Sequence, residues 1–182
     1  MRILAVDQAR RGGWSVFDYE TKKPIVYGTY SFTQKDCEFS DFLVKIKDLI
    51  CQIVESYEID AVFIEDIQMQ NNVDSFKKLA MLQGALISAF VEKEYLFDVI
   101  PPVRWQGFCN ARGRKASEIK AKIIEPQTEG KKASKVLSMQ FVREQFGIDT
   151  EDDNLADSLC IGWFVTNNVR IEKKGIQNEQ KK

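Results

Sequence analysis

The feature that most constrains the fold of this chain is a set of short apolar segments that carry acidic residues. Asp7 follows the apolar run of residues 3–6 in a strand-like segment that begins at Arg2, and Glu65 follows that of residues 61–64. Both runs are typical of buried strands, and a carboxylate at the end of a buried strand needs a cation or hydrogen-bond donors because it loses hydration. Asp157 lies in a third apolar segment, mid-way along a helical pattern. The sequence therefore predicts that these acids come together.

Several carboxylates at neighbouring positions would form a site for a hard divalent cation. Mg²⁺ and Mn²⁺ prefer oxygen ligands, and their charge offsets the repulsion between carboxylates. Asp153 precedes Asp157 by one helical turn, and Asn154 lies close to the same face. The predicted ligands are Asp7, Glu65 and Asp157, with Asp153 or Asn154 as the fourth.

Three of the acids also have a structural explanation. Asp7 could begin a turn, and Glu65 could pair with an arginine such as Arg104. Thr150 and Asp153 have the spacing of a helix capping box, so Asp153 is a cap or a ligand. Because the acids occur at matching positions in a chain without histidine, a metal site is the simpler interpretation.

The composition limits the class of protein. The chain has 182 residues, of which 44% are apolar and 29% charged, as expected for one globular domain. We expect that domain to span residues 1–171 and a disordered tail to follow at 172–182. No apolar run approaches the roughly eighteen residues of a membrane span, and charges interrupt the apolar start, so a cytoplasmic protein without export signal is expected.

The absence of histidine and the wide spacing of the cysteines limit the reactions that the chain could catalyse. The chain has no histidine and four widely spaced cysteines. Histidine-dependent nucleophilic catalysis is therefore excluded, a zinc site is disfavoured, and the cysteines are expected to be reduced thiols. Gly12 and Gly13 alone do not form a phosphate-binding loop, so no small-molecule cofactor is expected. Catalysis would have to come from carboxylates, lysines or metal ions.

Positive charge is local. The formal net charge is −1, yet residues 112–135 contain eight basic and only three acidic residues. Such a segment is either a phosphate-binding surface or an ordinary solvated helical face.

The order of predicted elements gives the fold class. Strands are expected at residues 2–6, 14–19, 25–32, 61–65 and 96–100, with a turn at 10–13, and helices at 40–57, 73–91, 134–146 and 151–167. Ser40 is the expected N-cap of the first helix, a short turn runs through Trp105, and a basic helical stretch begins at Ser117. The result is an α/β fold, in which an antiparallel three-strand meander and two parallel strands form a mixed sheet flanked by helices. Asp7 and Glu65 would share its carboxyl edge.

Four motifs in a fixed order carry a family resemblance across nearly the whole chain. They are Ile3-Leu-Ala-Val-Asp7-Gln with Gly12-Gly13-Trp14, Val62-Phe-Ile-Glu65-Asp66-Ile-Gln68, Pro102-Val-Arg-Trp105, and Asp152-Asp-Asn-Leu-Ala-Asp157-Ser-Leu. This set resembles the RNase H-like nuclease superfamily, and within it the RuvC-type Holliday junction resolvases, especially the small proteins of phages and Gram-positive bacteria. RuvC proteins often have an acid or histidine where this chain has Asn154.

The resemblance implies phosphodiester hydrolysis with two Mg²⁺ or Mn²⁺ ions per site. Asp7 would bridge the ions, and Glu65 and Asp157 would hold one ion each. Lys132 and Lys135 would balance charge in the transition state or hold flanking phosphates. Because junction resolution needs two symmetric nicks, the resemblance also implies a homodimer that binds a four-way junction or other branched DNA.

The partner surfaces are less constrained. The helix at 73–91 is a candidate dimer interface, with the small residues Ala80, Gly84 and Ala85 beside Phe76, Leu79 and Leu86, although core packing explains them equally well. Trp14, Trp105 and Phe108 could stack on unpaired bases or belong to the core. Two other functions stay open: another nuclease of this fold, acting on flaps or RNA/DNA hybrids, and a non-catalytic nucleic-acid-binding protein.

Overall fold

Five strands form one mixed sheet in the order β3-β2-β1-β4-β5. The computed structural model describes residues 1–33, 35, 37–68, 72–112, 133–172 and 175–178. The strands are β1 (Arg2–Asp7), β2 (Arg11–Asp18), β3 (Lys23–Ser31), β4 (Ala61–Glu65) and β5 (Leu96–Ile100). The first three pair antiparallel, whereas β1–β4 and β4–β5 pair parallel. The predicted mixed α/β sheet is confirmed.

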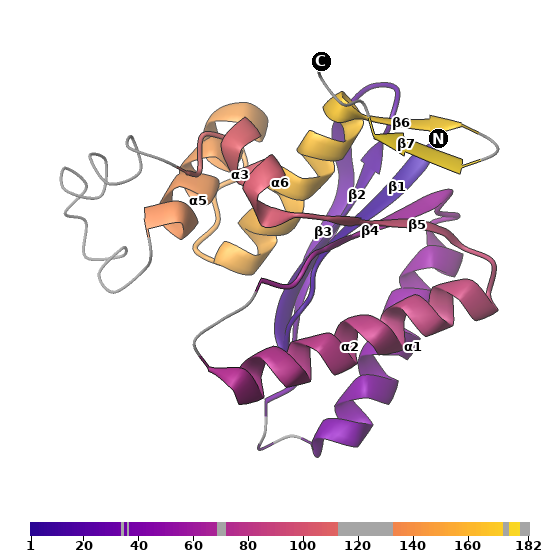
Figure 1. The fold of residues 1–182 in the computed structure, drawn as a ribbon. Coiled ribbons are helices and arrows are strands. Elements are labelled where there is room, and N and C mark those ends of the chain that lie inside the picture. The colour runs from indigo at the N-terminus through magenta and orange to yellow at the C-terminus, as the bar shows by residue number, and fades with distance from the viewer. Residues whose placement is uncertain (34, 36, 69–71, 113–132, 173–174, 179–182) are drawn as a thin grey trace.

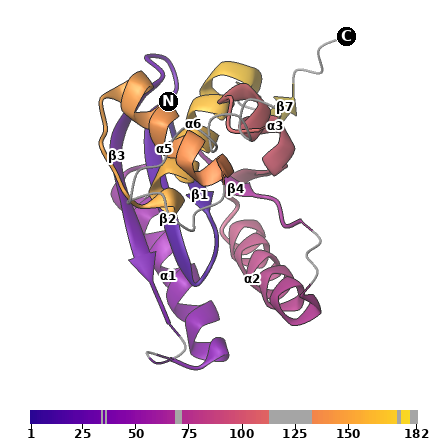
Figure 2. The same ribbon diagram turned by 90° about the vertical axis from the view of Figure 1, so that its left-hand side faces the viewer.

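Helices cover both faces of this sheet (Figure 1). They are α1 (Phe39–Ser56), α2 (Val73–Glu92), α3 (Pro102–Phe108), α5 (Ala133–Phe146) and α6 (Asp153–Asn168). One apolar cluster joins the sheet to α1 and α2, and a second joins it to α3, α5 and α6. In the view turned by 90°, the two helical groups again lie apart, with α1 and α2 away from α3, α5 and α6 (Figure 2).

The period of two in a strand divides each central strand between these clusters. In β1, Ile3 and Ala5 pack in the cluster with α6, and Leu4 and Val6 pack in the cluster with α1 and α2. All four side chains are fully buried, as the apolar run predicted. Any residue that continues β1 must therefore point to one of two helical layers.

Three local predictions differ from the structure. β2 begins at Arg11 rather than Trp14, because Gly12 and Gly13 pair within the sheet instead of forming a turn. The N-cap of α1 is Glu38, not Ser40, and its side chain makes no capping hydrogen bond. The segment through Trp105 is the helix α3. The expected basic helical stretch from Ser117 lies outside the described residues.

The C-terminal segment forms a small hairpin. β6 (Val169–Glu172) pairs antiparallel with β7 (Gly175–Asn178), so residues 175–178 differ from the disordered tail that the polar sequence predicted. A local backbone ladder supplies the order that composition does not indicate. Among the described residues, all four cysteines are free thiols, and no helix combines the length and apolar character needed to cross a membrane.

Candidate metal centre

Strand alternation places Asp7 and Glu65 together. Asp7 follows Ile3 and Ala5 at intervals of two, and Glu65 follows Ala61 and Phe63 in the same way, so both acids point to the layer of α3, α5 and α6. The parallel register pairs residue 6 with residue 64, which makes the two acids neighbours at the carboxyl edge. Asp7 is only 6% exposed. It is the last residue of β1, not the start of a turn.

Helix α6 brings the remaining acids to this edge. Its N-cap is Asp152, whose carboxylate accepts hydrogen bonds from the backbone N–H groups of Asn154 and Leu155 at 2.9 and 3.2 Å. The predicted capping box from Thr150 to Asp153 is therefore wrong, because the helix begins two residues later than that box requires. Asp153 is left as a first-turn acid on the same helical face as Asp157.

The close approach of α6 to β2 depends on Gly13. A Cβ atom at Gly13 would overlap the backbone carbonyl of Asn154, and it would lie 2.7 Å from the nitrogen of Leu155. Two residues along β2, the Ser15 hydroxyl donates to the carbonyl of Ser158 at 2.9 Å. The glycine therefore sets how closely the helical acids approach the strand acids.

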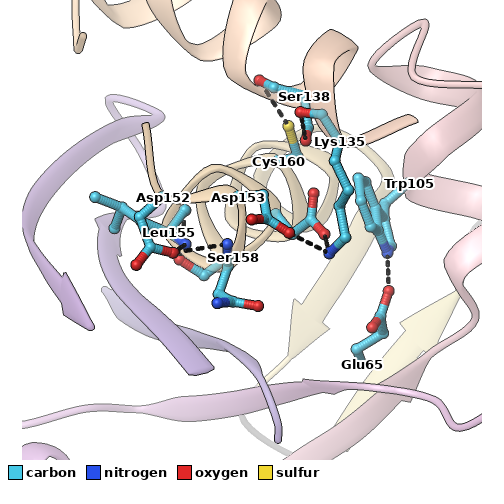
Figure 3. A network of polar contacts seen from close by, with 11 residues as sticks. Glu65, Trp105, Lys135, Ser138, Asp152, Asp153, Leu155, Ser158 and Cys160 are labelled. Atoms are coloured by element: carbon cyan, nitrogen blue, oxygen red, sulfur yellow. Dashed lines mark hydrogen bonds and ion pairs between the residues drawn. The ribbon is translucent and has the colours of Figure 1, made fainter. Parts of the chain in front are cut away.

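Lys135 of α5 pairs with both helical acids (Figure 3). Its ammonium lies 3.4 Å from Asp153 Oδ2 and makes a close ion pair with Asp157 Oδ2. The Asp157 side chain is 4% exposed, so this pair lies in a largely desolvated setting. Lys135 thus belongs to the acidic cluster rather than to the surrounding surface.

A different donor reaches Glu65. The indole N–H of Trp105 donates to Glu65 Oε1 at 2.9 Å (Figure 3), and Gln8 Nε2 donates to the backbone carbonyl of Glu65 at the same distance. The expected alternative partner, Arg104, lies over the Phe164 ring, 5.2 Å from its centre. The neutral indole is therefore one side-chain partner of Glu65, and Asp7 is another.

The electrostatics of the cluster favour protonation of the strand acids. Burial raises the pKa of Asp7 well above its ordinary value, and the charges of Glu65 and Asp157 raise it further. Burial and Asp157 raise the pKa of Glu65 to about 7, although the Trp105 hydrogen bond lowers it. Burial raises the pKa of Asp157 too, against the pull of Lys135. Negative charge therefore accumulates here at a cost that a cation would offset.

Burial disfavours the charged form of Lys135 as well, but attraction to Asp157 and Asp7 outweighs that effect. The pKa of the ammonium is therefore held above its ordinary value. The lysine stays charged across the physiological range.

The four carboxylates are of the ligand type that a hard divalent ion prefers, and among the described residues Asp157 Oδ1 is a buried oxygen without a hydrogen-bond partner. In the part of the chain that the structure describes, no three acidic or cysteine side chains lie close enough together to enclose an ion. The ammonium of Lys135 lies between the helical carboxylates instead.

Electrostatic interactions link Asp7, Glu65, Asp153, Asp157 and Lys135 into one cluster, and their roles as ligands or catalytic groups stay predictions. Asn154 contributes its backbone to the contact with Gly13. Lys132 and most of the basic segment lie outside the described residues.

The three aromatic residues that could stack on bases lie in different environments. Trp105 is 1% exposed and cannot stack on a base. Trp14 packs in the apolar cluster with α1 and α2, on the opposite sheet face from the acids, so it cannot stack at this site. Phe108 is 38% exposed and packs edge-on against Phe164.

Sequence reasoning missed two contributors, the Trp105 donor and the close contact at Gly13. Two adjacent glycines inside a strand pattern are a signal of close backbone approach.

The family model described as "Crossover junction endodeoxyribonuclease RuvC" matches residues 3–106. The chain belongs to the RuvC family. It is 38% identical over 93 residues to RuvC of Geotalea uraniireducens and 29% identical over 128 residues to RuvC of Helicobacter pylori strain G27. The chain spans about half the length of the first of these relatives, 54%. The family match includes Asp7, Glu65 and Trp105, whereas the helical acids and Lys135 lie beyond it.

Solved RuvC structures share the fold. The Thermus thermophilus RuvC structure superposes with a TM-score of 0.66 at 17% identity, covering 92% of this chain and 96% of that chain. The fowlpox virus Holliday junction resolvase gives a TM-score of 0.54 at 14% identity, covering 92% of this chain and 99% of that chain. At these identities the likeness shows the fold alone.

Proposed function

We propose that this chain is a metal-dependent endonuclease that resolves Holliday junctions or related branched DNA. The observation that carries the proposal is the convergence of four acids from β1, β4 and α6 at one sheet edge, in a chain of the RuvC family. One relative of the same fold is described as T. thermophilus RuvC in complex with a Holliday junction substrate. The cytoplasm, where bacterial and phage DNA recombine, is the compartment that suits this activity.

The acids suit two Mg²⁺ or Mn²⁺ ions. Asp7 interacts with the other three acids and would bridge the ions, and Glu65 and Asp157 would each hold one. Asp153 is favoured over Asn154 as the fourth ligand because it already shares a cation with Asp157. When bound, the ions would supply an activated water and stabilise charge on the phosphate and the leaving oxygen.

Lys135 has two functions in this scheme. Without bound ions its ammonium offsets the charge of Asp157, which keeps the buried carboxylate in place. With DNA present, the same ammonium is close enough to the acids to hold a phosphate oxygen or to balance negative charge as it develops. Lys132 is proposed as a second phosphate-binding group from the resemblance alone.

Two paired nicks require two sites, so a homodimer is part of the proposal. Helix α2 has an outward surface that includes Val73 at 58% and Met81 at 57% exposure, with Gly84 open beside them. Leu86 is fully buried in the core and is not available to a partner, contrary to its expected place in the interface. Sedimentation of the wild-type chain and of Met81→Glu would test this surface: a dimer that becomes monomeric supports it.

The decisive experiment is cleavage of an immobile four-way junction, beside a linear duplex, a flap and an RNA/DNA hybrid. Each substrate is incubated with Mg²⁺ or Mn²⁺, and Asp7→Asn serves as the control for contaminating nucleases. We expect paired symmetric nicks confined to the junction and absent from the variant.

The other outcomes separate the alternatives. Cleavage of flaps or hybrids at comparable rates would indicate a broader nuclease of the same fold. Junction binding without metal-dependent cleavage would overturn the enzyme proposal and leave a nucleic-acid-binding protein whose acids are structural.

A further inference from the structure

Trp105 is the one aromatic residue at the acidic cluster with a polar contact to an acid among the described residues. Its side chain is 1% exposed and packs in the apolar cluster of α3, α5 and α6. A buried tryptophan needs no polar partner for packing, but its N–H must be satisfied. Here that donor is directed to Glu65 Oε1 at 2.9 Å.

The backbone around this contact is fixed on both sides. Glu65 pairs with Ile100 in the parallel register of β4 and β5, and the N–H of Asp66 donates to the Ile100 carbonyl at 2.9 Å. Helix α3 starts two residues after Ile100, with Pro102 at its N-terminus, and packs against α6. The indole therefore reaches Glu65 from a helix that is anchored to the same strand pair and to the helix of Asp153 and Asp157.

The chemistry of the Trp105 indole differs from that of the Lys135 ammonium. An indole N–H only donates and carries no charge, whereas an ammonium neutralises the carboxylate it touches. A neutral donor can hold one carboxylate oxygen in place and leave the negative charge available to a cation. Metal-binding groups in proteins are commonly oriented by such outer hydrogen bonds.

We propose that Trp105 is a positioning residue: its indole N–H holds Glu65 Oε1, so that the other oxygen, Oε2, is presented to a divalent ion beside Asp7. This role rests on the proposed function. Trp105 acts through Glu65 and touches neither the ion nor DNA.

The test compares Trp105→Phe with Trp163→Phe. Both variants lose an indole N–H and a similar volume beside the same apolar cluster, but Trp163 packs edge-on against Phe146 rather than toward an acid. Mn²⁺ affinity is measured by calorimetry and by titration of the electron paramagnetic resonance signal, and junction cleavage is measured over a range of DNA concentrations up to saturation. We expect Trp105→Phe to lower Mn²⁺ affinity by roughly 10–100-fold and to lower kcat with little change in KM. Trp163→Phe should change neither.

A double-mutant cycle ties the effect to the carboxylate. In a Glu65→Gln background, Trp105→Phe should cause no further loss of Mn²⁺ affinity, because the oriented ligand is already gone. If Trp105→Phe does not fold, a benzothiophene analogue of tryptophan at position 105 keeps the ring shape and lacks the N–H.

Three results would overturn the role of Trp105: wild-type Mn²⁺ affinity in Trp105→Phe, an equal loss in Trp163→Phe, or a full further loss in the Glu65→Gln background. A wild-type chain that neither binds Mn²⁺ nor cuts junctions would overturn the proposed function, and this role with it.

Discussion

The two halves of the acidic cluster are stabilised in different ways. The strand half, Asp7 and Glu65, is set by the register of β1 and β4, and the side-chain donor it receives from another element is the uncharged Trp105 indole. The helix half, Asp153 and Asp157, shares the Lys135 ammonium. Ionisation of the strand half is therefore less compensated than that of the helix half, and we infer that it has the stronger demand for a cation.

This difference follows from backbone geometry. A strand end holds its side chain to one face of the sheet and offers few places for a lysine to approach. A helix face is open to its neighbour, and α5 crosses close to α6 in the same layer (Figure 1), so a long basic side chain can reach two acids one turn apart.

The largest expected effect is that of Asp7→Asn. In the presence of Mg²⁺, junction cleavage should fall by about 10³-fold or more, because a carboxyl group that interacts with the other three acids is lost. The unfolding temperature measured with chelator should rise, since a buried group whose charged form is disfavoured is replaced by a neutral group of similar size. A fall in that temperature would contradict the view that the strand half is strained by its charge.

Lys135→Met should have the next largest effect, on stability. Without its ammonium, Asp157 is a buried charge lacking its closest partner, so the free energy of unfolding with chelator should fall by about 3 kcal/mol at neutral pH. Saturating Mn²⁺ should recover more stability in this variant than in the wild type.

The matched control for that variant is Lys93→Met. Lys93 pairs with Glu55 at 2.6 Å, but the two side chains are 44% and 62% exposed, so its loss should cost far less stability than the loss of Lys135. Equal losses in the two variants would mean that the helix half is no more than a surface ion pair.

The pH dependence of the metal-free protein tests the strand half. Because the pKa of Glu65 is raised from 4.5 to about 7, its neutral form is favoured in the folded state. The stability that this group contributes is therefore present below pH 4.5 and is lost as the pH rises to about 7, by up to about 3 kcal/mol. Urea unfolding with chelator should show this slope, and Glu65→Gln should flatten it. If the free energies of unfolding of the wild type and of Glu65→Gln changed with pH in the same way, this prediction would be wrong.

The smallest expected effect comes from Gly13→Ala, which alters the distance between the halves. Its Cβ would overlap the backbone of α6, so the variant should lose about 1–3 kcal/mol and bind Mn²⁺ more weakly. Gly107→Ala in α3 is the control, because nothing lies within 4 Å of its added Cβ. That variant should keep its Mn²⁺ affinity and be at least as stable. The same loss in both would remove Gly13 from any role in the site.

Sequence patterns predicted the strands well and the helix starts less well. The apolar runs before Asp7 and Glu65 have the length and composition of buried strands, which few other elements share. Both strands form as expected. The N-caps are harder to predict, because several polar residues near residues 40 and 152 could precede the first turn of a helix. Tertiary packing decides which of them does.

The sequence by itself determined the mixed sheet, the shared edge of Asp7 and Glu65, and the carboxylate composition of the acidic cluster. These follow from the period of strands and from the residue types present, which act locally. Tertiary structure alone decided that the Trp105 donor reaches Glu65, that Lys135 joins the helical acids, and that Gly13 admits α6. Those contacts join residues 22 to about 140 positions apart, and their partners are chosen by packing between layers, which no local pattern records.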